Sequence, residues 1–225
     1  MRVDGIFVLG LFLLPLPAGA GAQADTASHI SRAWIAPAAG VATAAVFDSE
    51  IREWSIHEKS PRLDRIAKTI NPLGTGRVLM PAMAATYVTS RLLGDTAFSR
   101  GTIKVASAYL FANIAESILK PAIGRERPHL GGNPRKFHPF TSNGDWHSLP
   151  SAHVAHITAV VSAINAQSGS RAVCILGDAL IALVSLDRVY EDQHWASDVA
   201  FTVALTPAVS RSAIRFLDSH FPALR

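Results

Sequence analysis

Long segments of helix-forming residues follow one another through most of this chain, and they favour a helical fold above any other. The sequence has 225 residues, of which 49% are apolar. Ala, the best helix former, is abundant among them. A chain of this length can bury a substantial core as one domain. We therefore predict an all-α fold, a single bundle of about six helices within residues 25–225.

Capping and breaking residues set the limits of the predicted helices. Gly94-Asp95 separates two of them, and Asp95 is the expected N-cap of the second. Residues 48–60 mix charged residues with Trp54 and His57 and are predicted as a polar segment between helices. An Ala-rich segment, with possible N-caps from Ser28 to Ser31, runs to about Phe47 and is interrupted by Pro37. The predicted helices that follow cover about residues 62–70, 77–93, 95–119, 151–167, 171–186 and 191–216.

The stretch of residues 124–150 shows no helical periodicity. It contains Gly131-Gly132, Pro134, Pro139 and Gly144, all of which interrupt regular structure. Typical connections in compact domains have about four to six residues, so a much longer one is expected to serve a function. We predict that this long loop covers an active site.

The N-terminal residues have the pattern of a secretory signal peptide. Arg2 is followed by an apolar run from Ile6 to Leu16, and then by small residues at A-x-A spacing as far as Ala24. An uncleaved anchor is the competing interpretation, although the run is short for one. We predict a signal peptide over residues 1–24, and hence an exported protein of the periplasm or the membrane.

Charge and hydropathy narrow the expected partners. The formal net charge is +4, which fits an anionic substrate or an anionic membrane surface. The sequence contains no run of Lys and Arg with interleaved aromatic residues, so nothing in it indicates nucleic-acid binding. The later apolar runs are shorter than the roughly 20 residues of a bilayer span. A periplasmic or membrane-peripheral bundle is favoured, and an integral membrane protein remains the alternative.

The segment from Asp187 to Asp198 carries the first candidate for chemistry. His194 and Asp198 stand at i and i+4, which on a helix places both side chains on one face. A carboxylate that accepts a hydrogen bond from one ring nitrogen leaves the other nitrogen free as a nucleophile or base. Arg188 would add a permanent cation suited to phosphate. Taken alone, such a group is more often a surface hydrogen bond.

Two further clusters stand at the ends of the long loop. At its entrance, six residues separate Lys120 from Arg127-Pro128, and Pro150-Ser151-Ala152-His153 stands at its exit, where a helix begins. A helix N-terminus presents free N–H groups to an anion, and Ser151 adds a hydroxyl. Together the three clusters suit a phosphoryl group better than a neutral substrate.

In order and spacing, these clusters resemble the type 2 phosphatidic acid phosphatase and vanadium haloperoxidase superfamily. Its signature is Lys, six residues, Arg-Pro; then Pro-Ser-Gly-His; then Ser-Arg, five residues, His, three residues, Asp. The chain departs from it at Ala152, which replaces Gly, and at Asp187, which replaces Ser. We expect Ala152 to be harmless if it is helical. Asp187 could divert the Arg188 guanidinium or support it from behind.

The resemblance implies hydrolysis of a phosphomonoester in two steps, without a metal or other cofactor. His194, oriented by Asp198, would attack phosphorus and become phosphohistidine, while His153 would protonate the leaving alkoxide. The phosphoryl oxygens would be bound by Lys120, Arg127, Arg188, Ser151 and the backbone N–H of Ala152.

The substrate expected from the sequence is a lipid phosphate or diphosphate, to which the loop residues Phe137-His138-Pro139-Phe140 are suited. A soluble, broad-specificity periplasmic acid phosphatase is the alternative. Less favoured are a haloperoxidase with His194 as vanadium ligand and a non-catalytic phosphate-binding protein. A metal site of His138, Asp145 and His147 lacks a recognisable ligand pattern.

Overall fold

The structure, a computed structural model, describes residues 34–224, and this part of the chain is all-α, as predicted. It forms nine α-helices, so the prediction of about six was too low. Six of the nine have 12 to 28 residues, and α4, α5 and α8 are shorter. The helices are α3 (Ile35–Val46), α4 (Asp48–His57), α5 (Pro61–Ile70), α6 (Gly76–Leu92), α7 (Thr96–Ile123), α8 (Pro128–Gly131), α9 (Ala152–Ser168), α10 (Arg171–Tyr190) and α11 (Ala196–His220).

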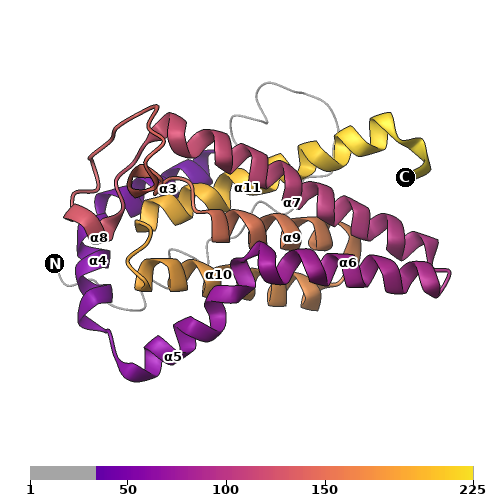
Figure 1. Cartoon of the computed structure of the whole chain (residues 1–225), viewed down its shortest axis with the longest axis horizontal. Coiled ribbons are helices and arrows are strands. Elements are labelled where there is room, and N and C mark those ends of the chain that lie inside the picture. The colour runs from indigo at the N-terminus through magenta and orange to yellow at the C-terminus, as the bar shows by residue number, and fades with distance from the viewer. Residues whose placement is uncertain (1–33, 225) are drawn as a thin grey trace.

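Helix α9 is the centre of the bundle. It packs against α7, α10 and α11, and Figure 1 shows it between α7 and α10. Every residue from Val154 to Val161 on this helix is buried. A helix that is apolar on all sides is stable only when neighbours surround it.

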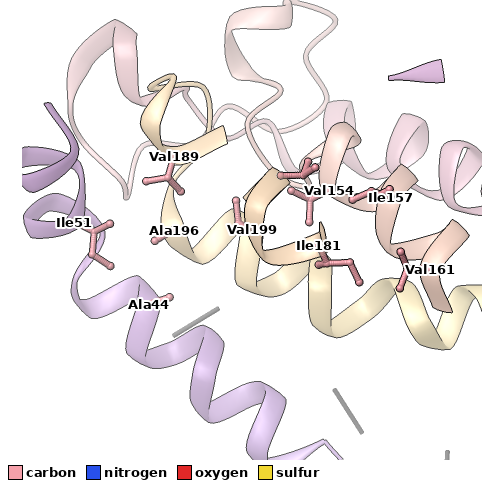
Figure 2. Close-up of a cluster of buried hydrophobic side chains, with 10 residues drawn as sticks. Ala44, Ile51, Val154, Ile157, Val161, Ile181, Val189, Ala196 and Val199 are labelled. Carbon is pink, nitrogen blue, oxygen red and sulfur yellow. The ribbon is translucent and has the colours of Figure 1, made fainter. Parts of the chain in front are cut away.

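Two clusters of buried residues form the core. The first joins α9, α10 and α11 to the N-terminal helices, where Ala44 of α3 and Ile51 of α4 are fully buried, and Figure 2 shows these side chains. The second lies between α7 and α9 and includes Ala108, Ala112 and Ala159. Small side chains let the two helices approach closely, which fixes the end of α7 relative to the start of α9.

Helix α4 occupies a segment for which the sequence indicated no helix. Its buried residues Asp48, Ile51 and Ser55 follow helical spacing, but two of the three are polar. The apolar periodicity that predicts an amphipathic helix is therefore missing. The buried carboxylate of Asp48 finds its partners on segments distant in sequence.

Three helix limits differ from the prediction and change how the candidate residues are presented. Helices α7 and α10 run about one turn further, so Lys120 and Arg188 lie on helices. Helix α11 begins later, at Ala196, so His194 precedes it. The C-terminal ends of α7 and α10 and the N-terminal ends of α9 and α11 meet at one end of the bundle, beside α8 (Figure 1).

The predicted long loop is present over residues 124–151 and contains only two short helical turns, α8 and η2 (Gly144–Trp146). Backbone hydrogen bonds hold it, among them Arg127 N to Asp145 O at 3.0 Å and Ser148 N to Arg125 O at 3.0 Å. Gly124 begins the loop with a φ of 61°, and a Cβ there would lie 1.9 Å from the carbonyl oxygen of His138. The loop is thus packed against its own start.

The predicted signal peptide, residues 1–24, lies outside the described residues. Within residues 34–224, no helix combines the length and the apolar character that crossing a bilayer requires.

Candidate active site

Three cationic side chains lie near enough to the two candidate histidines to lower the pKa of both. Burial, followed by charges that include those of Arg188, Lys120 and Arg127, lowers the pKa of His153 to about 4. The pKa of His194 lies well below its ordinary value. Burial of the ring is the largest cause, and the charges of Arg127, Lys120 and Arg188 lower the pKa further. Both rings are therefore neutral at pH 7. The structure brings these five predicted residues together.

Neighbouring side chains hold two of the cations in place. The Lys120 ammonium lies 3.3 Å from the buried Glu116 carboxylate, one turn earlier on α7. Arg127 Nη1 donates to the side-chain oxygen of Gln193 at 3.1 Å, and its Nε donates to the Gly144 carbonyl at 3.1 Å. Glu116 was not predicted from the sequence, although its i, i+4 spacing from Lys120 indicates such a contact.

The N-terminus of α9 offers free donors. Ser151 is fully buried, yet its hydroxyl has no hydrogen-bond partner within residues 34–224. An N-cap serine ordinarily accepts a bond from the first helical turn, and here it does not. The hydroxyl and the N–H groups of that turn remain available to an anion. Ala152 is the first helical residue, so a Gly with positive φ is not needed there.

The contact between His194 and Asp198 differs from the prediction. His194 Nδ1 lies 2.6 Å from the carbonyl oxygen of Ser148 and 3.9 Å from Asp198 Oδ2. A carbonyl oxygen only accepts, so Nδ1 carries the proton and Nε2 keeps its lone pair. The expected ring-to-carboxylate hydrogen bond is replaced because His194 lies outside the helix that contains Asp198.

Asp198 is instead the centre of a buried polar network. Its carboxylate accepts from Arg125 Nη1 at 2.5 Å, from the Ser148 hydroxyl at 2.5 Å and from the Trp195 backbone N–H at 2.9 Å. Arg125 also donates to Asp48 at 2.8 Å, and Asp48 accepts from Ser197. Four residues of this network were not predicted from the sequence: Arg125, Asp48, Ser148 and Ser197. Of these four residues, only Arg125 lies within a predicted cluster, between Lys120 and Arg127, and so could have been expected near the site.

Asp187 binds Arg188 from one side. Arg188 Nε and Nη2 both donate to Asp187 Oδ2, at 2.9 and 2.6 Å. This contact uses one edge of the guanidinium and leaves Nη1 with no hydrogen-bond partner among the described residues. The Asp187 carboxylate thus contacts one edge of the Arg188 guanidinium, and the Nη1 group on the other edge can still donate to an oxyanion.

Asp187→Asn is expected to tighten the binding of inorganic phosphate about tenfold, or about 1.4 kcal/mol. The amide oxygen still accepts from Arg188, but the negative charge beside the anion site is gone. Competitive inhibition by phosphate at pH 7 measures the effect. Asp187→Ala, which also removes the acceptor, should weaken binding, whereas Asp178→Asn on the same helix should leave it unchanged. Equal inhibition of Asp187→Asn and wild type would show that the Asp187 charge does not oppose the anion.

His153 faces the site with a free ring. Its backbone packs against η1 (Asn71–Gly74), where a Cβ on Gly74 would lie 2.8 Å from the His153 Cβ. The ring makes no hydrogen bond within residues 34–224. It is thus fixed at its base and free to exchange a proton with a bound group.

Anion binding is expected to draw a proton onto His153. Its pKa of about 4 reflects burial and the nearby cations, and an anion that offsets those charges raises the pKa again. Sulfate does not change its own protonation in this pH range. When sulfate binds near pH 5.5, the protein should therefore gain up to about one proton. Calorimetry in two buffers of different ionisation enthalpy measures this uptake. His153→Gln should abolish it and the exposed His57→Gln should not; equal uptake by His153→Gln would exclude this residue.

The three loop residues considered for a metal site do not form one. His147 Nε2 lies 2.9 Å from the Thr141 carbonyl oxygen, and the His138 ring contacts Trp146. Within residues 34–224, no three side chains of the His, Cys, Asp or Glu type lie close enough to share a metal ion.

Comparisons with known proteins bear on the site as a whole. The sequence model of the PAP2 superfamily matches residues 101–221, a range that includes all eight predicted site residues. Among curated proteins, no sequence matches the chain. The fold is similar to that of the transmembrane PAP2-type phosphatidylglycerolphosphate phosphatase from Bacillus subtilis, with a TM-score of 0.63 at 18% identity. The similarity covers 83% of this chain and 96% of that one.

Proposed function

The chain belongs to the PAP2 superfamily, and on that premise we propose that it is a phosphatase that hydrolyses phosphomonoesters through a phosphohistidine on His194. One observation carries the proposal. The charges of Lys120, Arg127 and Arg188 act on a neutral His194 whose Nδ1 is hydrogen-bonded and whose Nε2 is therefore the free nucleophile.

In the first step, His194 Nε2 attacks phosphorus and a P–N bond forms while the P–O bond to the leaving group breaks. Protonated His153 gives its proton to the leaving alkoxide. The three cations and the N-terminus of α9 neutralise the phosphoryl oxygens, which is the main contribution of a protein to this transfer. The Asp198 carboxylate, 3.9 Å from Nδ1, stabilises the imidazolium that results.

In the second step, water attacks the phosphohistidine. His153, now neutral, takes a proton from the water as the P–N bond breaks. Phosphate leaves, His194 returns to its neutral form, and His153 is again protonated for the next cycle. His194 is thus the nucleophile, and His153 changes from general acid in the first step to general base in the second.

We further propose that the substrate is a lipid phosphate or diphosphate of the cell envelope, met at a membrane surface by the exported protein. Apolar side chains at the loop support this: Phe140 is 89% exposed and Phe137 is 48% exposed. Exposed Leu110, Ile114 and Ile118 continue along α7 toward Lys120. The similar Bacillus subtilis protein is named for a lipid phosphate.

Trapping of the phosphorylated protein in alkaline denaturant tests the proposal. Purified protein receives a radiolabelled phosphoryl group from either a micellar lipid phosphate or a soluble aryl phosphate, and acid-labile label is measured. We expect label from both donors, with more from the lipid. A better aryl donor would favour the broad-specificity acid phosphatase. No label from either donor on folded protein would contradict the phosphohistidine mechanism.

A further inference from the structure

We propose that Ser148 is a positioning residue for His194: its backbone carbonyl sets the tautomer of the ring, and its hydroxyl ties that carbonyl to Asp198. This inference rests on the proposed function, because it concerns how the nucleophile of that reaction is held. It assigns to a loop residue a task that the sequence motif suggests for Asp198.

Both groups of Ser148 make short contacts in a fully buried place. The carbonyl oxygen lies 2.6 Å from His194 Nδ1, and the hydroxyl lies 2.5 Å from Asp198 Oδ2. Ser148 has no exposed surface, and its N–H donates to the Arg125 carbonyl at 3.0 Å. Bonds on the N–H and the hydroxyl therefore fix the direction in which the carbonyl points.

Asp198 is poorly placed to take over this task. Its Oδ1 accepts from Arg125, and its Oδ2 accepts from both the Ser148 hydroxyl and the Trp195 N–H. Turning the carboxylate toward the ring would break hydrogen bonds in a fully buried network and leave their donors unsatisfied, which is unfavourable. Asp198 therefore anchors Ser148 and acts on His194 through its charge.

This division of tasks has a chemical consequence. A carbonyl acceptor is neutral, so it fixes the Nδ1–H tautomer without drawing a second proton onto the ring. The nucleophile stays neutral among cations, and the charge of Asp198 contributes most once the imidazolium has formed. Ser148 also lies three residues before Ser151, so one short segment holds both the nucleophile and part of the anion site.

The first arm of the test reads the tautomer directly by nitrogen NMR of labelled histidine rings, with the His194 signals assigned from their loss in His194→Gln. We expect an Nδ1–H, Nε2-lone-pair ring in wild type, and the same tautomer in Asp198→Asn because the carbonyl remains. Loss of that tautomer in Asp198→Asn, or an Nε2–H ring in wild type, would overturn the proposal.

The second arm does not depend on the folding of Asp198→Asn. Ser148→Ala should lower kcat roughly 10- to 100-fold with little change in KM, and should speed solvent exchange of the Nδ1 proton. Ser148→Thr, which restores the hydroxyl, should recover most of the wild-type kcat and most of the slow proton exchange. Ser210→Ala, at another buried serine, is the matched control. Equal behaviour of the Ala and Thr variants would refute the role of the hydroxyl.

The two arms separate this proposal from the proposed function. The tautomer and the exchange rate are measured without turnover, so they stand even if no substrate is hydrolysed. If phosphohistidine forms, it should be the Nε2 isomer, and an Nδ1 isomer would overturn the positioning role while leaving the phosphatase intact.

Discussion

His194→Gln is expected to lower kcat about ten-thousand-fold or more and to abolish the phosphohistidine. The glutamine amide can still donate to the Ser148 carbonyl, so packing is kept while the nucleophile is lost. His153→Gln should retain more activity, with a loss of about 10²- to 10⁴-fold that is greatest for poor leaving groups. Steady-state kinetics on a lipid phosphate and an aryl phosphate measure both effects.

The control for these variants is His57→Gln, since His57 is exposed on α4 and outside the site. Its kcat should equal that of wild type. Binding of phosphate to His194→Gln, measured by calorimetry, should remain close to wild type because the three cations are unchanged. Retention of a tenth or more of wild-type turnover by His194→Gln would rule out His194 as the nucleophile.

The sequence predicted the parts of this site that depend on local spacing. The clusters around Lys120, Ser151 and His194 match a known signature in order and interval, and the PAP2 superfamily match confirms the resemblance. The all-α class followed from helix propensity, and the long loop from its Gly and Pro residues. Each of these inferences used residues close together in the chain.

What the sequence could not predict depends on distant contacts. Asp48 meets Arg125 across 77 positions, and nothing around residue 48 indicates a buried carboxylate. Ser148 precedes a recognised motif but gains its role only where it meets His194, 46 positions later. The i, i+4 spacing of His194 and Asp198 suggested a direct bond, which failed because the helix starts between them.

The charge of the site is also more balanced than its motif residues indicate. Each of two predicted phosphate ligands has a carboxylate within 3.3 Å: Glu116 for Lys120 and Asp187 for Arg188. Both carboxylates are buried. They lower the cost of holding cations in a buried place without substrate. An incoming phosphoryl group must then compete with part of that charge, which is why Asp187→Asn is expected to tighten phosphate binding.

Arg125→Met should destabilise the fold by roughly 3–5 kcal/mol at pH 7. Arg125 is buried between Asp48 and Asp198, at 2.8 and 2.5 Å, and methionine fills its place without a charge. The two carboxylates would then remain buried without their shared cation. Equilibrium unfolding in denaturant measures the loss, and the exposed neighbour Arg135→Met should change stability by less than about 0.5 kcal/mol.

The pH dependence of the stability of Arg125→Met tests whether the unpaired charge of Asp198 causes the loss of stability. Burial raises the pKa of Asp198 even with Arg125 present, and Arg125 is the largest influence that lowers it. Without Arg125 the pKa of Asp198 in the folded protein rises further. In the unfolded chain this pKa is about 4, so above about pH 4 the folded variant binds more protons than its unfolded chain. Stability of the variant relative to wild type must then fall as pH rises from about 4 to 7. A deficit of equal size at both pH values would show that Arg125 stabilises the fold by packing and not as the counterion of Asp198.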